Sequence, residues 1–436
     1  MIDLLQCTLP EFISELRNKN IVRFFFAYDA QSKTVVASHK ELQPIADFLL
    51  ADERDFLKHE GLFCELSSAY NIVHGAFVHG TRRGQAAGGT RFWRYETFED
   101  YVRDGLRLSQ GMTRKNALAG LWWGGGKGVI SRDPDIDINN PEIRKEIFQE
   151  YGRFVTSIQG CYITAEDVGT TPTDIDTIFS KTRFVTCISP QFGGSGNPSS
   201  ATALGVFRGM EAAFFFKDGG NLAGRRIVMQ GLGHVGEALL DLVLKSGVKS
   251  VHAFDINPTI VDGIKARYPD AALHAACLDP NDTSFLDLDC DLFSPCATGG
   301  VLNPETIPRL RASVVCGAAN NQLEDAVRDD KLLASRGILY VPDFLVNRMG
   351  IVQCANEQYG HVDNDSFIER HLDKEWEQSV YQMTLKVLQR AKDTGEPPAH
   401  SAIQIADELA LQEHPVFGHR GQEIISTLVR RGWQNL

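Results

Sequence analysis

The sequence predicts an α/β protein with two domains, the second of which contains a doubly wound parallel sheet. With 436 residues, the chain exceeds the length that one hydrophobic core usually serves. After Pro198, apolar strand-like runs alternate with helix-like runs, and this alternation favours parallel βαβ units. A glycine turn at residues 231–236 directly follows one of these strands and opens a helix-like run.

The composition is that of an ordinary globular protein that acts on small molecules. The formal net charge of -12 argues against nucleic acids and anionic membranes as main partners, because both attract basic surfaces. No apolar stretch is long enough to span a membrane, and no basic leader precedes an apolar run. The nine cysteines show no CxxC pair, so no metal site is predicted. We therefore expect a cytoplasmic protein.

In the first third of the chain the pattern predicts three strands and two helices. The strands are expected at 21–28, 34–39 and 71–80, with a helix at 42–59 between the second and third. A second helix is expected from Phe98, because Thr97 and Asp100 resemble a capping box. This helix would carry Lys115 at its end.

In the remainder, the predicted elements are a helix at 201–216, strands at 225–230 and 250–255, and a helix at 366–394. Ser366 with Glu369 marks the expected start of the last helix, and Gly395 its expected end.

The segment 111–130, GMTRKNALAGLWWGGGKGVI, holds two lysines beside glycine-rich backbone. Lys115 and Lys127 in such a place suggest a site that binds an anion and moves protons, since burial disfavours the charged form of lysine. Two ordinary surface lysines flanking a loop are the alternative interpretation.

The glycine turn has the residues of a dinucleotide site. Gly231 permits the tight turn, Gly233 lets backbone approach a pyrophosphate, and Gly236 lets the helix pack on the strand; His234 and Val235 lie between them. Asp255, at the end of the next strand, is placed to bind a ribose and would repel a 2′-phosphate. NAD is therefore favoured over NADP. A glycine turn with a solvated aspartate is the alternative.

Together these motifs resemble the amino-acid dehydrogenase family that includes the leucine, phenylalanine, valine and glutamate dehydrogenases, with the closest match to the leucine and phenylalanine branch. The resemblance runs from about residue 76 to residue 360 and rests on the segments GGTRFW (88–93), RLSQGMTRKNALAG (107–120), GGGKGVI (124–130), TAEDVGT (164–170), SGNPS (195–199), GLGHVG (231–236), DPND (279–282), SPCATGG (294–300) and GAANNQL (317–323).

The resemblance implies NAD-dependent, reversible oxidative deamination of an L-amino acid to a 2-oxo acid and ammonia. It also implies three parts: a substrate and oligomerisation domain (1–185), a Rossmann-type NAD domain (186–345) and a C-terminal helical segment (346–436) that returns to the first domain. Relatives are homo-oligomers, so a homo-oligomer is expected.

By the same resemblance, Lys115 binds the substrate carboxylate, Lys127 is the catalytic lysine, and Asp167 binds the amine and relays protons. Asp167 as the N-cap of a following helix is the competing interpretation. Thr202, Asn320 and Asn321 would lie near the nicotinamide, with turn formation as the alternative for the two asparagines.

The positions that match the side-chain pocket are neutral and mostly small. They comprise Ala87, Gly88, Gly89, Ala165, Ile351 and Cys354. Where the glutamate-specific branch has a lysine, this chain has Ala87, and a carboxylate buried there would lack a partner. The resemblance therefore implies a branched-chain or aromatic substrate rather than glutamate.

One departure from the family stands at Arg348 and Met349, where an alanine and a glycine are usual. These side chains could narrow the pocket, add a charge or shift the backbone. Arg82 and Arg83 are further differences, interpreted as a solvated face. The rival functions are a hydroxy-acid dehydrogenase and a catalytically impaired NAD-binding regulatory protein, and Lys115, Lys127 and Asp167 argue against both.

Overall fold

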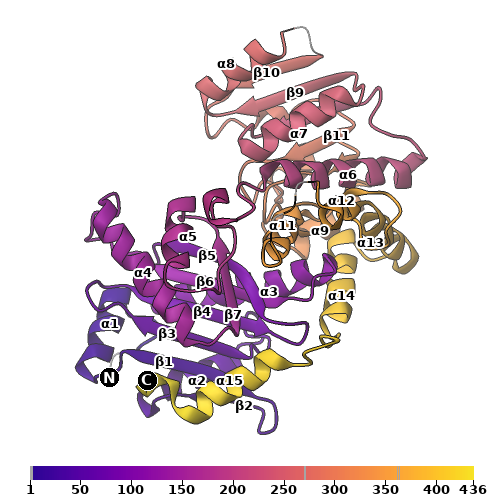
Figure 1. Cartoon of the computed structure of the whole chain (residues 1–436). Coiled ribbons are helices and arrows are strands. Elements are labelled where there is room, and N and C mark those ends of the chain that lie inside the picture. Colours follow the sequence, from indigo (N-terminus) through magenta and orange to yellow (C-terminus); the bar gives the residue numbers. More distant parts are fainter. Residues whose placement is uncertain (1–2, 270–271, 361, 363) are drawn as a thin grey trace. The chain divides into compact units, whose positions relative to one another are not determined.

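The structure is a computed structural model that describes residues 3–269, 272–360, 362 and 364–436 (Figure 1). The chain forms two compact units. Unit 1 contains the chain up to Gly196, a short segment that starts at Glu357, and Asp407–Leu436. Unit 2 contains Asn197–Asn356 and a segment that ends at Ala406.

Unit 1 is built on a mixed seven-stranded sheet with the order β2-β1-β3-β4-β6-β5-β7. The first five strands in this order are antiparallel, whereas β5 runs parallel to both β6 and β7. The strands are β1 (Arg23–Asp29), β2 (Thr34–Ala37), β3 (Gly61–Leu66), β4 (Val73–Gly80), β5 (Ala86–Trp93), β6 (Gly124–Ser131) and β7 (Tyr162–Glu166). The expected strands at 21–28, 34–39 and 71–80 correspond to β1, β2 and β4.

Helices pack against this sheet through two clusters of buried apolar side chains. One cluster joins α1 (Leu9–Asn18), α2 (Gln43–Ala51) and α3 (Phe98–Leu118) to the strands, and the other joins α4 (Pro141–Ser157), α5 (Pro172–Phe179) and α15 (Arg420–Arg431) to them. Figure 1 shows α15, in yellow, with the strands of unit 1. Trp433 then packs edge-on against Phe63 of β3, with ring centroids 5.3 Å apart. Of the expected C-terminal segment, Asp407–Leu436 belongs to unit 1.

The helix expected at 42–59 is shorter than predicted. A 3₁₀ turn at Lys40–Leu42 leads into α2, which ends at Ala51. Asp52 then accepts hydrogen bonds from the backbone N–H groups of Asp55 and Phe56, at 3.0 and 2.9 Å, and so fixes a loop in place of further helical turns. An aspartate that caps the backbone in this way competes with helix propagation.

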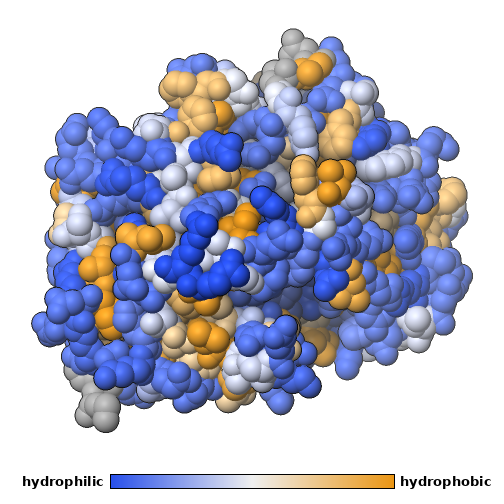
Figure 2. Space-filling model, turned by 60° about the horizontal axis from the view of Figure 1, so that its bottom comes forward, coloured by the Kyte–Doolittle hydropathy of each residue, from blue (hydrophilic) through white to orange (hydrophobic). Residues whose placement is uncertain are grey.

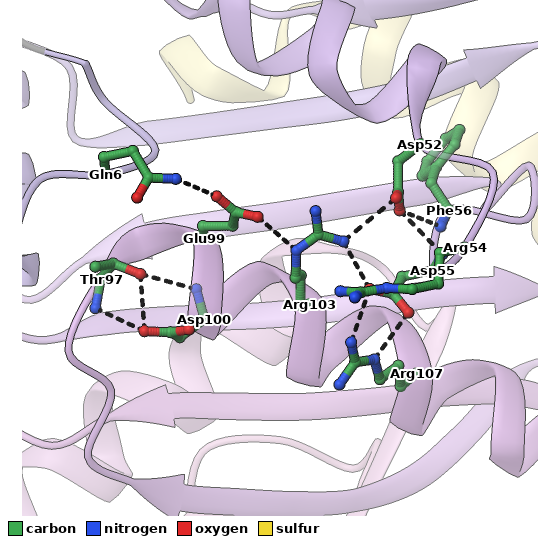
Figure 3. A network of polar contacts seen from close by, with 10 residues as sticks. All are labelled: Gln6, Asp52, Arg54, Asp55, Phe56, Thr97, Glu99, Asp100, Arg103 and Arg107. Atoms are coloured by element: carbon green, nitrogen blue, oxygen red, sulfur yellow. Dashed lines mark hydrogen bonds and ion pairs between the residues drawn. The ribbon is translucent and has the colours of Figure 1, made fainter. Parts of the chain in front are cut away.

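That loop is tied to α3 by a network of arginines and carboxylates (Figure 3). The buried Asp55 accepts hydrogen bonds from Arg103 at 2.7 Å and Arg107 at 2.8 Å, and also from its neighbour Arg54. Burial raises the pKa of Asp55, but these arginines outweigh it and lower the pKa to about 2. The network fixes the helix that carries Lys115.

Unit 2 contains a six-stranded sheet with the order β10-β9-β8-β11-β12-β13, parallel throughout. Numbered within the unit, this is the 3-2-1-4-5-6 order of the doubly wound dinucleotide-binding fold. The strands are β8 (Arg226–Gln230), β9 (Ser250–Asp255), β10 (Leu273–Cys277), β11 (Leu292–Pro295), β12 (Val314–Val315) and β13 (Leu339–Tyr340). The predicted fold class is confirmed.

The helices of unit 2 include the predicted one at 201–216, which extends slightly at both ends as α6. They are α6 (Ser199–Asp218), α7 (His234–Lys245), α8 (Pro258–Arg267), α9 (Arg328–Ser335), α10 (Asp343–Val346), α11 (Met349–Glu357, whose last residue belongs to unit 1), α12 (Ser366–Leu372) and α13 (Val380–Thr394). The prediction of a single helix at 366–394 is wrong. This segment forms two helices, α12 and α13, whose N-caps are Asp365 and Ser379 rather than a Ser366–Glu369 capping box. Gly395 follows the end of α13, as predicted, and has left-handed backbone.

Helix α14 (Pro398–Ala410) begins in unit 2 and ends in unit 1. Within the described residues, no helix combines the length and the apolar character that crossing a bilayer requires. The face in Figure 2 is mostly hydrophilic, with small separate apolar patches.

Candidate active site

The triple glycine before Lys127 lies inside the sheet rather than in a loop. All eight residues of β6 are buried. A side chain at Gly125 would collide with the backbone of Thr113 on α3, and one at Gly126 would come within 2.7 Å of the Tyr162 ring. The glycines let α3 and the neighbouring strands close on β6, so their role here is packing rather than an anion cradle.

Lys127 is buried and forms an ion pair with Asp167. The residue is 4% exposed, and its Nζ donates to Oδ2 of Asp167 at 2.6 Å. Burial raises the pKa of the Asp167 carboxyl, but the charge and hydrogen bond of Lys127 and the charge of Arg91 outweigh it and hold the pKa below its ordinary range. The interpretation of Lys127 as an ordinary surface lysine is therefore wrong.

Asp167 follows β7 directly and does not cap a helix. The N-cap of α5 is Thr171, which forms a capping box with Asp174. The backbone of Asp167 is fixed by Thr170, whose hydroxyl accepts from the N–H at 2.9 Å and donates to the carbonyl at 2.7 Å. This turn leaves the Asp167 carboxylate for Lys127, so the N-cap interpretation is excluded.

The small residues predicted for the pocket make room for this pair. Gly89 of β5 pairs with Ala165 of β7, and a side chain at Gly89 would come within 2.8 Å of the Asp167 Cβ. A side chain at Gly88 would meet Met112 of α3 at 2.9 Å. Ala87, Gly88, Gly89 and Ala165 thus lie on two adjacent buried strands beside the Lys127–Asp167 pair.

Lys115 lies in the last turn of α3 and is half-buried. Helix α3 begins at the predicted capping box of Thr97 and Asp100. Its end is fixed over β5 by Asn116, whose amide donates to the carbonyls of Ala87 at 3.3 Å and Gly124 at 2.6 Å. The structure therefore brings the helix end that carries Lys115 onto the strand of Gly88 and Gly89.

Three residues of this site, Arg91, Asp104 and Tyr95, are not among the residues predicted from the sequence. Arg91, on β5, places its Nε 3.5 Å from Oδ2 of Asp167. Its Nη1 contacts both oxygens of Asp104 at 3.2 Å, and the Tyr95 hydroxyl donates to Asp104 at 2.6 Å. One signal was available, because Arg91 stands two residues after Gly89 and residues two apart share a face of a strand.

In unit 2, the predicted glycine turn and Asp255 lie together. Gly231 has a φ of 96°, which favours glycine, and Gly233 is the N-cap of α7, which starts at His234. The Asp255 carboxylate accepts from the N–H of Leu232 at 2.7 Å. A Cβ at Gly233 would meet no atom within 4 Å, whereas one at Gly236 would collide with the carbonyl oxygen of Gly231.

These residues fit the diphosphate and ribose of a dinucleotide. The open space at Gly233 lies at the start of α7, where the N–H groups and the helix dipole favour an anion. Val235 lies in the first turn of α7, next to His234. Among the described residues, no group of three or more His, Cys, Asp or Glu side chains is placed to hold a metal ion.

The remaining predicted cofactor residues lie in two other segments of unit 2. Thr202 is in the first turns of α6 and is 9% exposed. Asn321 has a φ of 53° and donates its backbone N–H to Asp343, while the Asn320 side chain accepts from Asn347 at 2.8 Å. The left-handed backbone of Asn321 supports its interpretation as a turn former.

Ile351 and Cys354, the other predicted pocket residues, are buried in α11. The departure at Arg348 and Met349 does not involve left-handed backbone. Arg348 is fully buried and donates to the carbonyl of Gln378, and burial lowers its pKa to about 9. This arginine links α11 to the segment before α13.

The interpretation of Arg82 and Arg83 as a solvated face holds for Arg82 only. Arg83 is 4% exposed, its guanidinium lies 4.4 Å from the centroid of the Trp122 ring, and its Nε donates to the carbonyl of Leu121 at 3.0 Å. Its Nη1 donates to Leu409 and Gln412 at 3.0 and 2.6 Å. Arg83 thus anchors the end of α14 within unit 1.

Comparison with known proteins identifies the family. Residues 66–184 match the dimerisation domain of the Glu/Leu/Phe/Val dehydrogenases, and residues 193–414 match the glutamate/leucine/phenylalanine/valine dehydrogenase domain. The chain belongs to this family. The predicted relationship to the amino-acid dehydrogenases is confirmed.

Individual relatives agree with the family assignment. The chain is 42% identical to leucine dehydrogenase of Geobacillus stearothermophilus over 76% of this chain and 85% of the relative. It is 41% identical to valine dehydrogenase of Streptomyces coelicolor over 78% and 88% of the two chains. Among solved structures, L-tryptophan dehydrogenase from Nostoc punctiforme is similar, with a TM-score of 0.67 and 34% identity over 81% of this chain and 96% of that one.

Proposed function

We propose that this chain catalyses the NAD-dependent, reversible oxidative deamination of an apolar L-amino acid, with water, to the 2-oxo acid and ammonia. The observation that carries the proposal is the ion pair of the buried Lys127 with the half-buried Asp167, at 2.6 Å, in a chain of the amino-acid dehydrogenase family. Such a pair couples a proton-exchanging amine to an ionised carboxylate, and these two groups can act as general acid and base toward a substrate amine.

Three residues of unit 1, Lys115, Asp167 and Lys127, have separate roles in the proposed reaction. Lys115 holds the substrate carboxylate by charge-assisted hydrogen bonds, which fixes the Cα hydrogen for transfer. Asp167 binds the substrate amine. Lys127 removes a proton from the water that attacks the imine carbon and, in the reverse direction, protonates the oxygen that leaves as water.

The cofactor supplies one step, since NAD accepts the Cα hydrogen as hydride. The chain holds it with unit 2, where Gly231, Gly233 and Gly236 would take the diphosphate and Asp255 the adenosine ribose. The Asp255 carboxylate favours NAD because it would repel the 2′-phosphate of NADP. Thr202, Asn320 and Asn321 are proposed to lie near the nicotinamide.

The proposed substrates are branched-chain or aromatic amino acids. Ala87, Ala165, Ile351 and Cys354 are all buried and carry no charge, so they offer no partner to the side-chain carboxylate of glutamate. The names of the relatives point the same way, since they are leucine, valine and L-tryptophan dehydrogenases.

The deciding experiment measures NADH formation with a panel of L-amino acids at alkaline pH, and NADH consumption with the matching 2-oxo acids and ammonia. We expect turnover with at least one of leucine, valine, isoleucine, phenylalanine and tryptophan, and little with glutamate. Silence in both directions, from protein shown to bind NAD, would refute the proposal.

We also infer a homo-oligomer in the cytoplasm. The match of residues 66–184 to a dimerisation domain supports self-association, and sedimentation velocity of the purified chain tests it. A monomer at micromolar concentration would contradict the inference.

A further inference from the structure

Two cations share a single oxygen of Asp167. Lys127 Nζ lies 2.6 Å from Oδ2 in a hydrogen bond, and Arg91 Nε lies 3.5 Å from the same atom as an ion pair. The Arg91 Nε is shielded from solvent and has no hydrogen-bond partner within the described part of the chain. A buried N–H group next to a carboxylate oxygen is therefore available for a second hydrogen bond to that oxygen.

The far side of the Arg91 guanidinium is fixed. Its Nη1 contacts both carboxylate oxygens of Asp104 on α3 at 3.2 Å. Tyr95 then holds Asp104, since its hydroxyl donates to Oδ2 at 2.6 Å. This clamp keeps Arg91 directed at Asp167 without any contribution from Lys127.

The two cations differ in chemistry. Burial lowers the pKa of the Arg91 guanidinium, but the charges of Asp104 and Asp167 outweigh it and raise that pKa, so Arg91 stays protonated, whereas a lysine can give up its proton. In the proposed function Lys127 does so during turnover. Asp167 is half-buried, and burial raises its pKa, so after losing its nearest positive charge it would take up a proton unless a second cation remained.

We propose that Arg91 is a positioning residue that keeps Asp167 ionised and in place while Lys127 exchanges its proton, with the Arg91 Nε–H taking over Oδ2. The proposal rests on the proposed function, because that function gives Lys127 its proton exchange. It concerns no group of unit 2.

The other titratable groups around Asp167 cannot replace Arg91. Glu166 precedes it on β7, and burial together with the charges of Asp174 and Asp167 raises the pKa of Glu166. Asp104 and Tyr95 stand behind Arg91, on α3 and after β5. These groups are acids, so any charge they carry opposes the ionisation of Asp167.

The test compares Arg91→Gln with Arg91→Lys and with Asp104→Asn. In Arg91→Gln one positive charge is lost, the pKa of Asp167 rises, and the acid limb of the kcat/KM profile moves to higher pH. At neutral pH we expect a loss in kcat/KM of about tenfold or more. Arg91→Lys should restore the limb because it keeps the charge. Asp104→Asn should move the limb to lower pH, since it removes a negative charge behind Arg91 but keeps an amide oxygen that can accept from Arg91 Nη1 and hold it in place.

A matched control is Arg103→Gln, on the same unit. Arg103 also bridges carboxylates, with contacts of 2.6 Å to Glu99 and 2.7 Å to Asp55, but it belongs to the network of Figure 3 and not to Asp167. We expect this variant to lose thermal stability and to keep the pH profile. A general loosening of unit 1 would instead move the profiles of both arginine variants alike.

A second measurement needs no turnover. Carbodiimide coupling of an uncharged amine to Asp167, followed by peptide mass spectrometry across pH, reports the protonated fraction of that carboxyl. Arg91→Gln should shift this curve to higher pH, and Arg91→Lys should return it. If both the coupling curve and the kcat/KM limb are unchanged in Arg91→Gln, the role of Arg91 is refuted while the dehydrogenase stands. If no amino acid is turned over, the proposed function fails, and the coupling curve still decides the role of Arg91.

Discussion

The two glycine-rich segments of this chain use glycine for opposite purposes. Gly124–Gly126 lie within a buried strand of unit 1, where the absent side chains let Thr113 and Tyr162 approach. Gly231–Gly236 form a turn of unit 2, where a Cβ at Gly233 would point into open space. In the first segment glycine allows protein to pack against protein, and in the second Gly233 leaves open space at the start of α7. Glycine-rich sequences thus serve close packing beside the Lys127–Asp167 pair in one unit and leave open space at the start of a helix in the other.

Lys127→Ala should have the largest effect on turnover of all the variants, and it should affect catalysis in unit 1 without affecting NAD binding by unit 2. We expect kcat to fall by about 10³-fold or more, because a positioned acid–base group contributes on that scale. NAD binding should persist, since the residues proposed to hold NAD belong to unit 2. Steady-state kinetics and NAD titration by calorimetry measure the two effects. Lys145→Ala, at an exposed position of α4, is the control. An unchanged kcat in Lys127→Ala would contradict its catalytic role.

Gly125→Ala should reduce stability, whereas Gly233→Ala should reduce NAD binding. The new methyl at Gly125 would overlap the Thr113 backbone, which should lower the free energy of unfolding by about 3 kcal/mol or more. At Gly233 the backbone is extended and the space is open, so stability should change by less than about 0.5 kcal/mol.

The same Gly233 variant should bind NAD at least about tenfold more weakly, because its methyl would occupy the approach to the diphosphate. Thermal unfolding and NAD titration of both variants check the contrast. Equal losses of stability in the two variants would show that glycine serves packing in both segments.

Local patterns were predictable from sequence. The capping box of Thr97 and Asp100 depends on residues three apart, and the turn at Gly231–Gly236 depends on a strand and helix that flank it directly. The pairing of Lys127 with Asp167 came only through the resemblance to a family, since 40 residues separate the two.

Contacts between distant segments were not predictable. Arg83 was interpreted as solvated because arginine usually is, yet it is buried by Leu409 and Gln412, more than 300 residues away. Arg91 was missed for the same reason, since its importance depends on where the turn after β7 places Asp167. The early end of α2 depends on the Asp52 carboxylate, which accepts from the backbone N–H groups of Asp55 and Phe56, and helical periodicity does not reveal these hydrogen bonds.

Asp255→Ser tests whether the second glycine-rich segment and Asp255 select NAD over NADP. The substitution removes the carboxylate that would oppose the 2′-phosphate and keeps a group able to hydrogen-bond. We expect the ratio of kcat/KM for NAD to that for NADP to fall by about tenfold, because like charges at such a distance cost on the order of 1 kcal/mol or more. The loss of the 2.7 Å bond from Leu232 to Asp255 should also loosen the turn. An unchanged ratio would assign Asp255 to the turn alone.

Asp330 is a buried carboxylate of unit 2 that, unlike Asp167, forms no ion pair with any residue that the structure describes. It accepts the backbone N–H of His400 at the start of α14, at 3.1 Å, and burial raises its pKa to about 6. A raised carboxyl pKa means that the folded state holds the proton more tightly than the unfolded state does. Stability from this group is therefore full below the unfolded value near 4 and is lost as pH rises to 6.

Asp330→Asn keeps an acceptor for His400 but cannot ionise, so it should not show this loss. Its free energy of unfolding relative to the native chain should rise by about 2–3 kcal/mol between pH 4 and pH 7, because the Asp330 pKa lies near 4 in the unfolded chain and at about 6 in the folded one. Urea unfolding at both pH values measures this, and a constant difference would show that Asp330 is ionised as easily as an exposed carboxyl. In unit 1 the same experiment on Asp167 should have the opposite sign, because its cations stabilise the ionised form and its contribution is lost as pH falls.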